Sequence, residues 1–280
     1  MGKIADALEK FNREKKTPLS THSIHPEGPP KKEGAGGKDP SEASTSVPGT
    51  GALDPRLIVF TQPRSLASEH FKLLRARLIN PRQGPVPRVV MVSSAMDKEG
   101  KSFVAANLAA SVAQSLEYHA LLIDCDLRKP SAHIYYGQNN DEGLSDYLQG
   151  RTPLPRLLKR PPVEKLSLLT AGPPPNKPSD LLSSARMADL IEEVRSRYPD
   201  RLVILDTTPV QLTSEPVNLA RFVDTVIFVV RYGKSKRELV EDSIERLGRG
   251  KILGVVFNAF EIPPRKYSYF RSKKYYGYYG

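Results

Sequence analysis

Five short segments between residues 88 and 258 are apolar at consecutive positions and rich in β-branched side chains. A strand that is apolar on both faces is typical of a parallel sheet covered by helices, whereas a half-exposed strand alternates apolar and polar positions. The pattern therefore predicts five strands of a buried parallel sheet. They are expected at RVVMVSS (88–94), HALLIDCD (119–126), RLVILDTT (201–208), DTVIFVVR (224–231) and KILGVVFN (251–258).

The stretches between these strands show the apolar spacing of amphipathic helices. SFVAANLAASVAQSL follows the first strand, ARMADLIEEVRSRY precedes the third, and SKRELVEDSIERLG precedes the last. Alternating strands and helices predict an α/β fold, a doubly wound and mainly parallel sheet with helices on both faces. We expect this domain to occupy residues 55–264.

The two ends of the chain have different patterns. Residues 1–16 place three apolar side chains at helical spacing among charges, which predicts a short amphipathic helix, either solvated or used for docking. Residues 17–54 are rich in Pro, Gly, Ser and Lys, and they are predicted to form a disordered linker because burial cannot offset the entropy of ordering. Residues 265–280 contain many tyrosines and no carboxylate, and we expect a flexible tail.

Composition narrows the function further. The chain has 280 residues, 39% of them hydrophobic, and a formal charge of +11, which favours anionic partners without choosing among them. No apolar run approaches the roughly 18 residues that span a bilayer, and the start lacks a signal-peptide apolar region, so we expect a cytoplasmic protein. The single cysteine, Cys125, excludes an internal disulfide and is expected to fill the packed face of its strand.

The sequence SSAMDKEGKSF joins the first strand to the first helix of the domain. Gly100-Lys101-Ser102 at such a junction is typical of a P-loop, in which backbone N–H groups hold phosphates, the lysine reaches the β and γ phosphates and the serine binds Mg²⁺. The full G-x-x-x-x-G-K-[ST] pattern is not met, and a chance GKS turn with a solvated lysine is the alternative. The candidate nucleotide-binding residues are Ala95, which stands at the first glycine position, Met96, Asp97, Lys98, Glu99, Gly100, Lys101, Ser102 and Phe103.

Carboxylates follow two of the predicted strands. Asp124 and Asp126 are two residues apart, which predicts that both project from one face, and Asp206 ends the strand RLVILD. Like charges so close need a cation, and open α/β sheets bind ligands at the carboxyl ends of their strands. A Mg²⁺ site beside the P-loop is therefore predicted, with a pair of turn carboxylates as the alternative.

These motifs together resemble the bacterial tyrosine kinases (BY-kinases) that accompany capsule and exopolysaccharide export, over roughly residues 60–260. SSAMDKEGKSF is similar to the family's modified Walker A motif, LLIDCDLRKP to its second Walker-type motif, and VILDTTPV to its Walker B motif. GLSDYLQG, LLTAGPPPNKPSDLL, VDTVIFVVRYGKS and ILGVVFN agree as well. The resemblance implies an ATP-dependent protein-tyrosine autokinase that uses ATP and Mg²⁺ and regulates polysaccharide synthesis or export.

The resemblance also implies roles for single residues. Lys101 would hold phosphates, Ser102 would bind Mg²⁺, and Asp126 and Asp206 would position the metal. Asp124 would accept the phenolic proton in a reaction that depends mainly on positioning. Asn258 corresponds to an asparagine that contacts adenine in related ATPases. The family usually has Pro-Gly where this chain has Asp97-Lys98, which removes a glycine from the loop and puts catalysis in doubt.

The stretch SEHFKLLR resembles the family's helical oligomerisation segment, E-x-x-R-x-x-R. Glu69 and Arg75 match, and Lys72 stands where arginine is usual. At three-residue steps these charges cover about 120° of a helix face, which suits a subunit contact. Lysine lacks the bidentate fork of arginine, so a weaker interface in a ring-like homo-oligomer is expected. The alternative is three solvated charges.

The tail is predicted to be the enzyme's own substrate, phosphorylated in trans by a neighbouring subunit. A flexible segment can present several phenols in turn to one site. The weaker alternative is nucleic-acid binding by tyrosine stacking and basic contacts. The predicted phosphoacceptors are Tyr267, Tyr269, Tyr275, Tyr276, Tyr278 and Tyr279.

Resemblance to the split members of the family implies a separate membrane-anchored partner, a polysaccharide co-polymerase that activates this chain and recruits it to the inner membrane. Other protein substrates are compatible with this picture. Two other functions stay open. A related ATP-switch ATPase would carry a lysine at the second P-loop position, where this chain has Met96. A pseudokinase scaffold would be compatible with the unusual Asp97-Lys98 pair.

Overall fold

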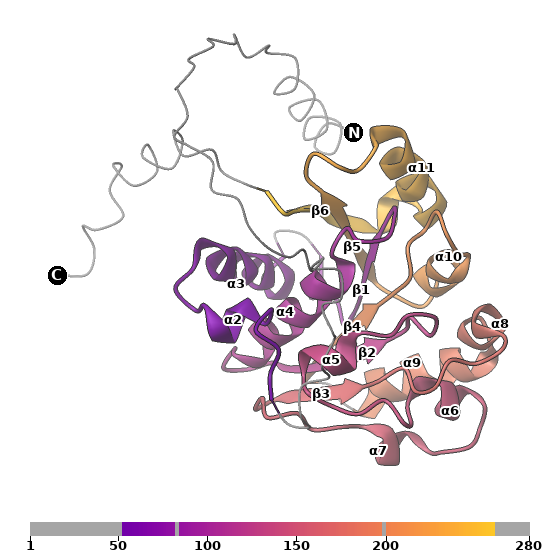
Figure 1. The fold of residues 1–280 in the computed structure, drawn as a ribbon. Coiled ribbons are helices and arrows are strands. Elements are labelled where there is room, and N and C mark those ends of the chain that lie inside the picture. Colours follow the sequence, from indigo (N-terminus) through magenta and orange to yellow (C-terminus); the bar gives the residue numbers. More distant parts are fainter. Residues whose placement is uncertain (1–51, 82–83, 198–199, 261–280) are drawn as a thin grey trace, which may run out of the picture. The chain divides into compact units, whose positions relative to one another are not determined.

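The computed structural model describes residues 52–81, 84–197 and 200–260 (Figure 1). The predicted helix at 1–16, the tail at 265–280 and nearly all of the predicted linker lie outside these ranges. Asp54, at the end of the predicted linker, is buried, and its carboxylate pairs with Arg56 at 2.7 Å. Its backbone N–H also donates to the carbonyl of Tyr135 at 3.0 Å. Ordered packing therefore begins before Pro55.

A six-stranded parallel sheet forms the centre of the described residues, with the strand order β3-β2-β4-β1-β5-β6. The doubly wound parallel fold predicted from the sequence is confirmed. The sequence pattern missed only β3, because four residues are too short to show a periodicity. The strands are β1 (Val89–Ser94), β2 (His119–Asp124), β3 (Leu166–Leu169), β4 (Arg201–Asp206), β5 (Thr225–Arg231) and β6 (Ile252–Asn258).

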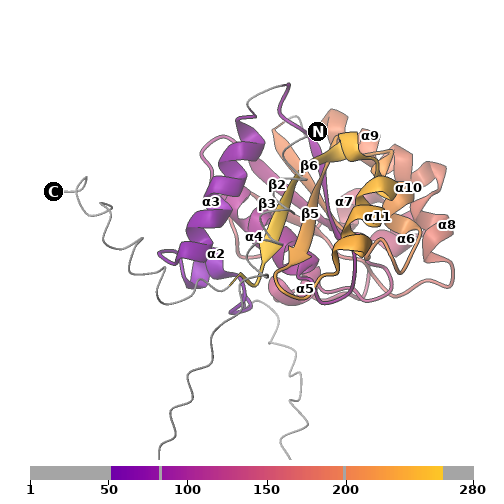
Figure 2. The same cartoon turned by 90° about the horizontal axis from the view of Figure 1, so that it is seen from above.

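Helices cover both faces of this sheet (Figure 2). On one side lie α2 (Ile58–Thr61), α3 (Leu66–Ile79) and α4 (Lys101–Ala113), and on the other lie α9 (Ala185–Arg197), α10 (Glu215–Ala220) and α11 (Arg237–Leu247). The predicted helices correspond to α4, α9 and α11. Short helical turns fill the connections: α5 (Ala132–Tyr135), α6 (Leu144–Leu148), α7 (Leu154–Leu157), α8 (Pro178–Leu182) and the 3₁₀ turn η1 (Arg249–Lys251).

Helix α4 is the centre of the packed layer on its side of the sheet. Ten of its thirteen residues are buried, and many are alanines, which let the helix approach both the strands and α3 closely. The hydroxyl of the fully buried Tyr136 donates to the carbonyl of Ala106 at 2.7 Å. Burial of the whole helix fixes its first turn, where the GKS motif lies, against the sheet.

Among the residues that the structure describes, no helix is both long enough and apolar enough to cross a bilayer.

Candidate active site

The GKS motif lies where the sequence predicts it, between the carboxyl end of β1 and the start of α4. Gly100 is the N-cap of α4 and has a φ of 94°, in the left-handed region that favours glycine. A Cβ at this position would lie 1.9 Å from the Nδ2 atom of Asn258. Glycine is therefore required at position 100 both by the backbone and by the available space.

Glu99 accepts the hydrogen bonds that hold the loop before Gly100. This carboxylate is buried, and its Oε2 atom accepts the N–H of Met96 at 3.0 Å. The hydroxyl of Ser235 donates to Oε1. The side chain of Asn258 at the end of β6 donates to the Glu99 carbonyl at 2.9 Å. Ser235, which follows β5, and Asn258, which ends β6, therefore both stabilise the P-loop conformation.

The two departures from the P-loop pattern differ in their structural effect. Ala95, at the first glycine position, is buried and has no positive φ, so alanine suits the backbone there. Lys98 has a φ of 62°, in the left-handed region that lysine rarely adopts. Its carbonyl accepts a hydrogen bond from Arg231 at 3.0 Å. The chain therefore holds a non-glycine residue where the resembled family has glycine, and the strain falls at this position.

The remaining loop residues lie at the surface or at the helix start. Asp97 is exposed, and its carboxylate lies 3.7 Å from the Nζ atom of Lys129. Ser102 is the second residue of α4. The ring of Phe103 packs edge to face on Phe71 of α3, at 5.8 Å between ring centres. The Phe103 ring therefore anchors the helix start, and the predicted nucleotide contact of Phe103 stays a prediction.

Lys101 and Asp126 are brought together. The Nζ atom of Lys101 lies 3.3 Å from Oδ2 of Asp126, and both side chains are nearly buried. Burial alone would lower the pKa of Lys101, but the negative charges of Asp206 and Asp126 outweigh burial and raise it. Lys101 is therefore a firmly charged group beside two carboxylates.

The Asp124 carboxylate is fully buried at the end of β2. Oδ1 accepts the N–H of Asp126 at 3.1 Å, and Oδ2 accepts those of Ser131 and Ala132, both at 2.9 Å. Asp124 thus organises the turn after β2, as the turn-carboxylate alternative expects. Burial, followed by the charge of Asp206, raises its pKa to about 8.

Asp206 ends β4 with a carboxylate that is 1% exposed. Neither of its oxygens has a partner in good hydrogen-bond geometry among the described residues, although the Ser102 hydroxyl and the Thr207 N–H lie near enough to lower its pKa. Burial raises the pKa of Asp206 to about 6, although the charge of Lys101 partly opposes the rise. A buried carboxylate without partners is costly unless a cation binds it.

These oxygens suit Mg²⁺. The described residues hold no group of three or more His, Cys, Asp or Glu side chains arranged to bind a metal by themselves. Mg²⁺ usually takes one or two carboxylates and completes its shell with water and substrate phosphates. Asp206, Asp126 and the hydroxyl of Ser102 are the residues that would hold it, beside a nucleotide.

Cys125 is fully buried between the two aspartates, as predicted for a residue on the packed face. Burial raises the pKa of its thiol. It is therefore a packing residue.

The structure does not place two groups of predicted site residues beside Lys101 and the acids. Glu69 and Lys72 on α3 form an ion pair with each other at 2.7 Å, and Arg75 donates to the carbonyl of Ser111 at 2.6 Å. Their role in a subunit contact stays a prediction. The six predicted phosphoacceptor tyrosines lie outside the described residues.

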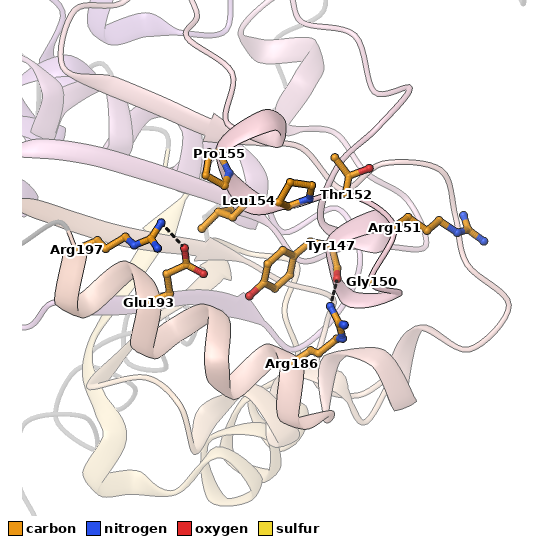
Figure 3. Close-up of a pocket in the computed structure, with 10 residues that line it drawn as sticks. Tyr147, Gly150, Arg151, Thr152, Leu154, Pro155, Arg186, Glu193 and Arg197 are labelled. Atoms are coloured by element: carbon orange, nitrogen blue, oxygen red, sulfur yellow. Dashed lines mark hydrogen bonds and ion pairs between the residues drawn. The ribbon is translucent and has the colours of Figure 1, made fainter.

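A pocket of about 480 Å³ lies elsewhere, between the α6–α7 connection and α9 (Figure 3). Tyr147 lies at its centre, and the lining includes Arg186 and the ion pair of Arg197 with Glu193, at 2.9 Å. Arg186 donates to the carbonyl of Tyr147 at 3.3 Å. No P-loop residue lines this pocket, so it is distinct from the candidate nucleotide site.

The sequence analysis missed several polar residues that support the site through hydrogen bonds. Glu215, Thr208, Ser235 and Arg231 contact either the P-loop or the segments carrying the acids. Ser214-Glu215-Pro216 is readable as a helix start, but nothing in the sequence shows that the Glu215 carboxylate is buried.

Comparisons with known proteins agree with this geometry. Residues 90–271 match the family model of the CobQ/CobB/MinD/ParA nucleotide binding domain. The putative tyrosine-protein kinase CapB of Staphylococcus aureus is 31% identical over 226 residues, which cover 80% of this chain and 95% of CapB. The tyrosine-protein kinase wzc of Salmonella typhi is 34% identical over 206 residues, which cover 73% of this chain but only 28% of that protein.

A solved structure agrees as well. The kinase domain of the Escherichia coli tyrosine kinase ETK superposes with a TM-score of 0.71 at 31% identity, covering 77% of this chain and 83% of that one. The family suggested by the motifs is confirmed. The chain belongs to the bacterial tyrosine-protein kinases, within the CobQ/CobB/MinD/ParA nucleotide-binding family.

Proposed function

We propose that this protein is an ATP-dependent protein-tyrosine autokinase that phosphorylates the C-terminal tyrosine cluster of a neighbouring copy. The observation that carries the proposal is the meeting of Lys101 with Asp126 at the GKS turn, beside the paired strand ends of Asp124 and Asp206. This arrangement provides a cation for phosphates, two oxygen ligands for a metal and a further carboxylate of raised pKa.

In the proposed reaction the phenolic oxygen attacks the γ-phosphorus of ATP. A new P–O bond forms, the bond to the β,γ-bridging oxygen breaks, and ADP leaves with that electron pair. Asp124 takes the phenolic proton in its ionised form; burial raises its pKa to about 8, so roughly a tenth of it is ionised at pH 7. Lys101 and the backbone N–H groups of the P-loop orient the phosphates. When bound, Mg²⁺ neutralises phosphate charge.

Phosphorylation of the tail would change the charge of the whole protein. Each phosphotyrosine adds about −1.5 to −2 charges, so six add roughly −9 to −12, comparable with the formal +11 of the chain. A ring held by docked basic tails would come apart after such a change. Glu69, Lys72 and Arg75 on α3 are the proposed subunit contact.

The proposed biological setting is polysaccharide synthesis or export. A membrane-anchored co-polymerase would activate the kinase and recruit it to the inner membrane, with the segment 1–54 as a candidate contact. This part of the proposal is supported by the family resemblance.

The test is incubation of the purified chain with Mg-ATP, with and without candidate activator tails, followed by mass spectrometry of the C-terminal peptide. The controls are Lys101→Met, a truncation at Arg265, and a chain with all six tail tyrosines changed to Phe. We expect phosphate on the tail of the wild type and none in Lys101→Met.

Phosphorylation that persists in Lys101→Met would overturn the site assignment. ATP hydrolysis without phosphotyrosine would favour the ATP-switch ATPase, and nucleotide binding with neither product would favour the pseudokinase scaffold.

A further inference from the structure

The carboxylate of Glu215 is the centre of a buried hydrogen-bond network behind the candidate active site. Glu215 is the first residue of α10 and is 1% exposed. Its Oε1 atom accepts hydrogen bonds from Nε of Arg128 and from the hydroxyl of Ser179, both at 2.9 Å. Its Oε2 atom accepts the hydroxyl of Thr208 at 2.9 Å. One buried charge therefore receives three donors from three different segments.

Two of these donors lie next to the acids of the site. Arg128 is two residues after Asp126, whose carboxylate contacts Lys101, and Thr208 is two residues after Asp206. The two acids lie at the ends of separate segments, and the structure gives no direct hydrogen bond between their side chains. The backbone N–H of Cys125 donates to the carbonyl of Asp206 at 2.8 Å, so the two strand ends are joined directly. Glu215 adds a side-chain link between the segments just beyond these strand ends.

Thr208, at the other end of the link through Glu215, is held in place as well. Thr208 is buried, its hydroxyl lies 2.6 Å from that of Thr213, and its carbonyl accepts the hydroxyl of Ser93 from β1 at 3.0 Å. Movement at the Arg128 end is therefore resisted by the strand end that carries Asp206.

A carboxylate suits this centre better than an amide does. Both oxygens of Glu215 act only as acceptors, one of them for a guanidinium, and hydrogen bonds between charged groups are about twice as strong as neutral ones. A glutamine keeps the shape but loses the negative charge that faces Arg128, and its amide N–H₂ meets Thr208 only if that hydroxyl turns to accept it and donates to Thr213 instead. Glu215 is buried but Arg128 is half exposed, so this pair contributes more to the local geometry than to the stability of the fold.

We propose that Glu215 is a positioning residue for phosphoryl transfer, acting through Arg128 and Thr208 to fix the separation of Asp126 and Asp206 across the metal and phosphate site. The inference rests on the proposed function for its catalytic consequence, but its binding consequence can be measured without catalysis. Groups that orient metal ligands typically change metal affinity or activity by about 10–100-fold when they are replaced.

The test compares Glu215→Gln with the wild type by calorimetric titration with ADP, with and without Mg²⁺, and by the rate of tail phosphorylation. We expect Mg²⁺ to enhance ADP affinity about tenfold less in the variant, while Mg²⁺-free affinity changes less than about twofold. The maximal rate should fall by about 10-fold or more, with the KM for ATP less affected.

A double-mutant cycle separates positioning from a general structural role. The cycle starts from a background variant that carries both Arg128→Gln and Thr208→Val. Adding Glu215→Gln to this background should change the Mg²⁺ enhancement little, because both of its connections are already removed. Arg128→Gln alone changes a half-exposed side chain, and it serves as the second variant if Glu215→Gln does not fold. It should reproduce part of the loss. The matched control is Glu241→Gln, which breaks an exposed pair with Arg237 at 2.7 Å and should change neither readout.

The proposal is overturned if Glu215→Gln lowers the melting temperature but leaves the Mg²⁺ enhancement intact, or if the effects in the cycle simply add. If the wild type binds Mg-ADP but phosphorylates nothing, only the proposed kinase function fails. The ADP titrations with and without Mg²⁺ would still decide the role of Glu215.

Discussion

Asp124 and Asp206 occupy paired positions at the carboxyl ends of the adjacent parallel strands β2 and β4. Neighbouring parallel strands lie about 4.8 Å apart, so the register places the two acids side by side. Both carboxylates are buried, and burial raises both pKa values. Asp124 accepts three backbone N–H groups, whereas the charge of Lys101, the Ser102 hydroxyl and the Thr207 N–H only partly offset the burial of Asp206. The strand register therefore creates a strongly negative site that Lys101 only partly neutralises.

The first prediction concerns Asp206→Asn. The pKa of Asp206 is raised to about 6 in the folded chain, so its ionisation opposes folding as pH rises from about 4 to about 6. The neutral variant should therefore be more stable than the wild type at pH 7, by about 1–2 kcal/mol, with the gain vanishing below about pH 4. Denaturant unfolding at several pH values measures the gain, and ADP titration should show that Mg²⁺ no longer enhances affinity. A variant less stable than the wild type at pH 7 would contradict this account.

The second prediction concerns Lys98→Gly, at the position where φ is 62°. A left-handed conformation costs a non-glycine residue about 1–2 kcal/mol, and glycine removes that cost at the expense of greater freedom in the unfolded chain. We expect a net gain of about 0.5–1 kcal/mol in unfolding free energy. Lys98→Ala is the matched control, because it removes the exposed side chain and keeps the strain. Equal effects of the two variants would show that the backbone conformation is not responsible.

The third prediction concerns Gly100 and Asn258. Gly100→Ala adds a methyl group 1.9 Å from the Asn258 amide at a φ of 94°, and it should weaken ADP binding about tenfold or more. Asn258→Ala removes the obstacle but also loses the hydrogen bond to Glu99, so it should weaken binding less. The double variant should bind better than the sum of the two losses predicts, because the clash is gone while the strain remains. Additive losses would exclude the contact as the cause.

The fourth prediction concerns the start of β1. One oxygen of Asp224 accepts the N–H groups of Arg88 and Val89, at 2.7 and 2.9 Å, and the other accepts Arg195 at 2.7 Å. Burial would raise the pKa of Asp224, but these hydrogen bonds outweigh burial and lower it. Its stabilising contribution is therefore present above the unfolded pKa of about 4 and is lost as pH falls through the folded pKa.

Asp224→Asn should accordingly lower the unfolding free energy at pH 7 by about 1 kcal/mol, a value discounted for a partly exposed site, and should weaken the acid-induced loss of stability. Urea unfolding between pH 3 and 7 measures both effects. Glu241→Gln, in an exposed helical pair, should change neither. A constant difference between Asp224→Asn and the wild type at every pH would exclude the ionised carboxylate as the cause.

The local patterns were sufficient for the fold class and for the site's location. Runs such as RVVMVSS and RLVILD predict buried strands because both faces are apolar, and carboxylates after such strands must meet at one edge of a parallel sheet. The GKS junction indicates the same edge. These inferences need only the neighbours of each residue along the chain, and for that reason they were accessible from the sequence. The four-residue β3 carried too little pattern to be found.

The sequence by itself determined which chemical groups are present and at which end of the strands they lie: a phosphate-binding turn, a lysine and three acids. Only the tertiary structure decided that Asp124 accepts three backbone N–H groups while Asp206 depends mainly on the charge of Lys101. It also decided that Asn258 closes the space over Gly100 and that Glu215 contacts Arg128, which lies 87 residues away along the chain. Such contacts depend on burial and on strand order, and neither is a property of any local stretch of sequence.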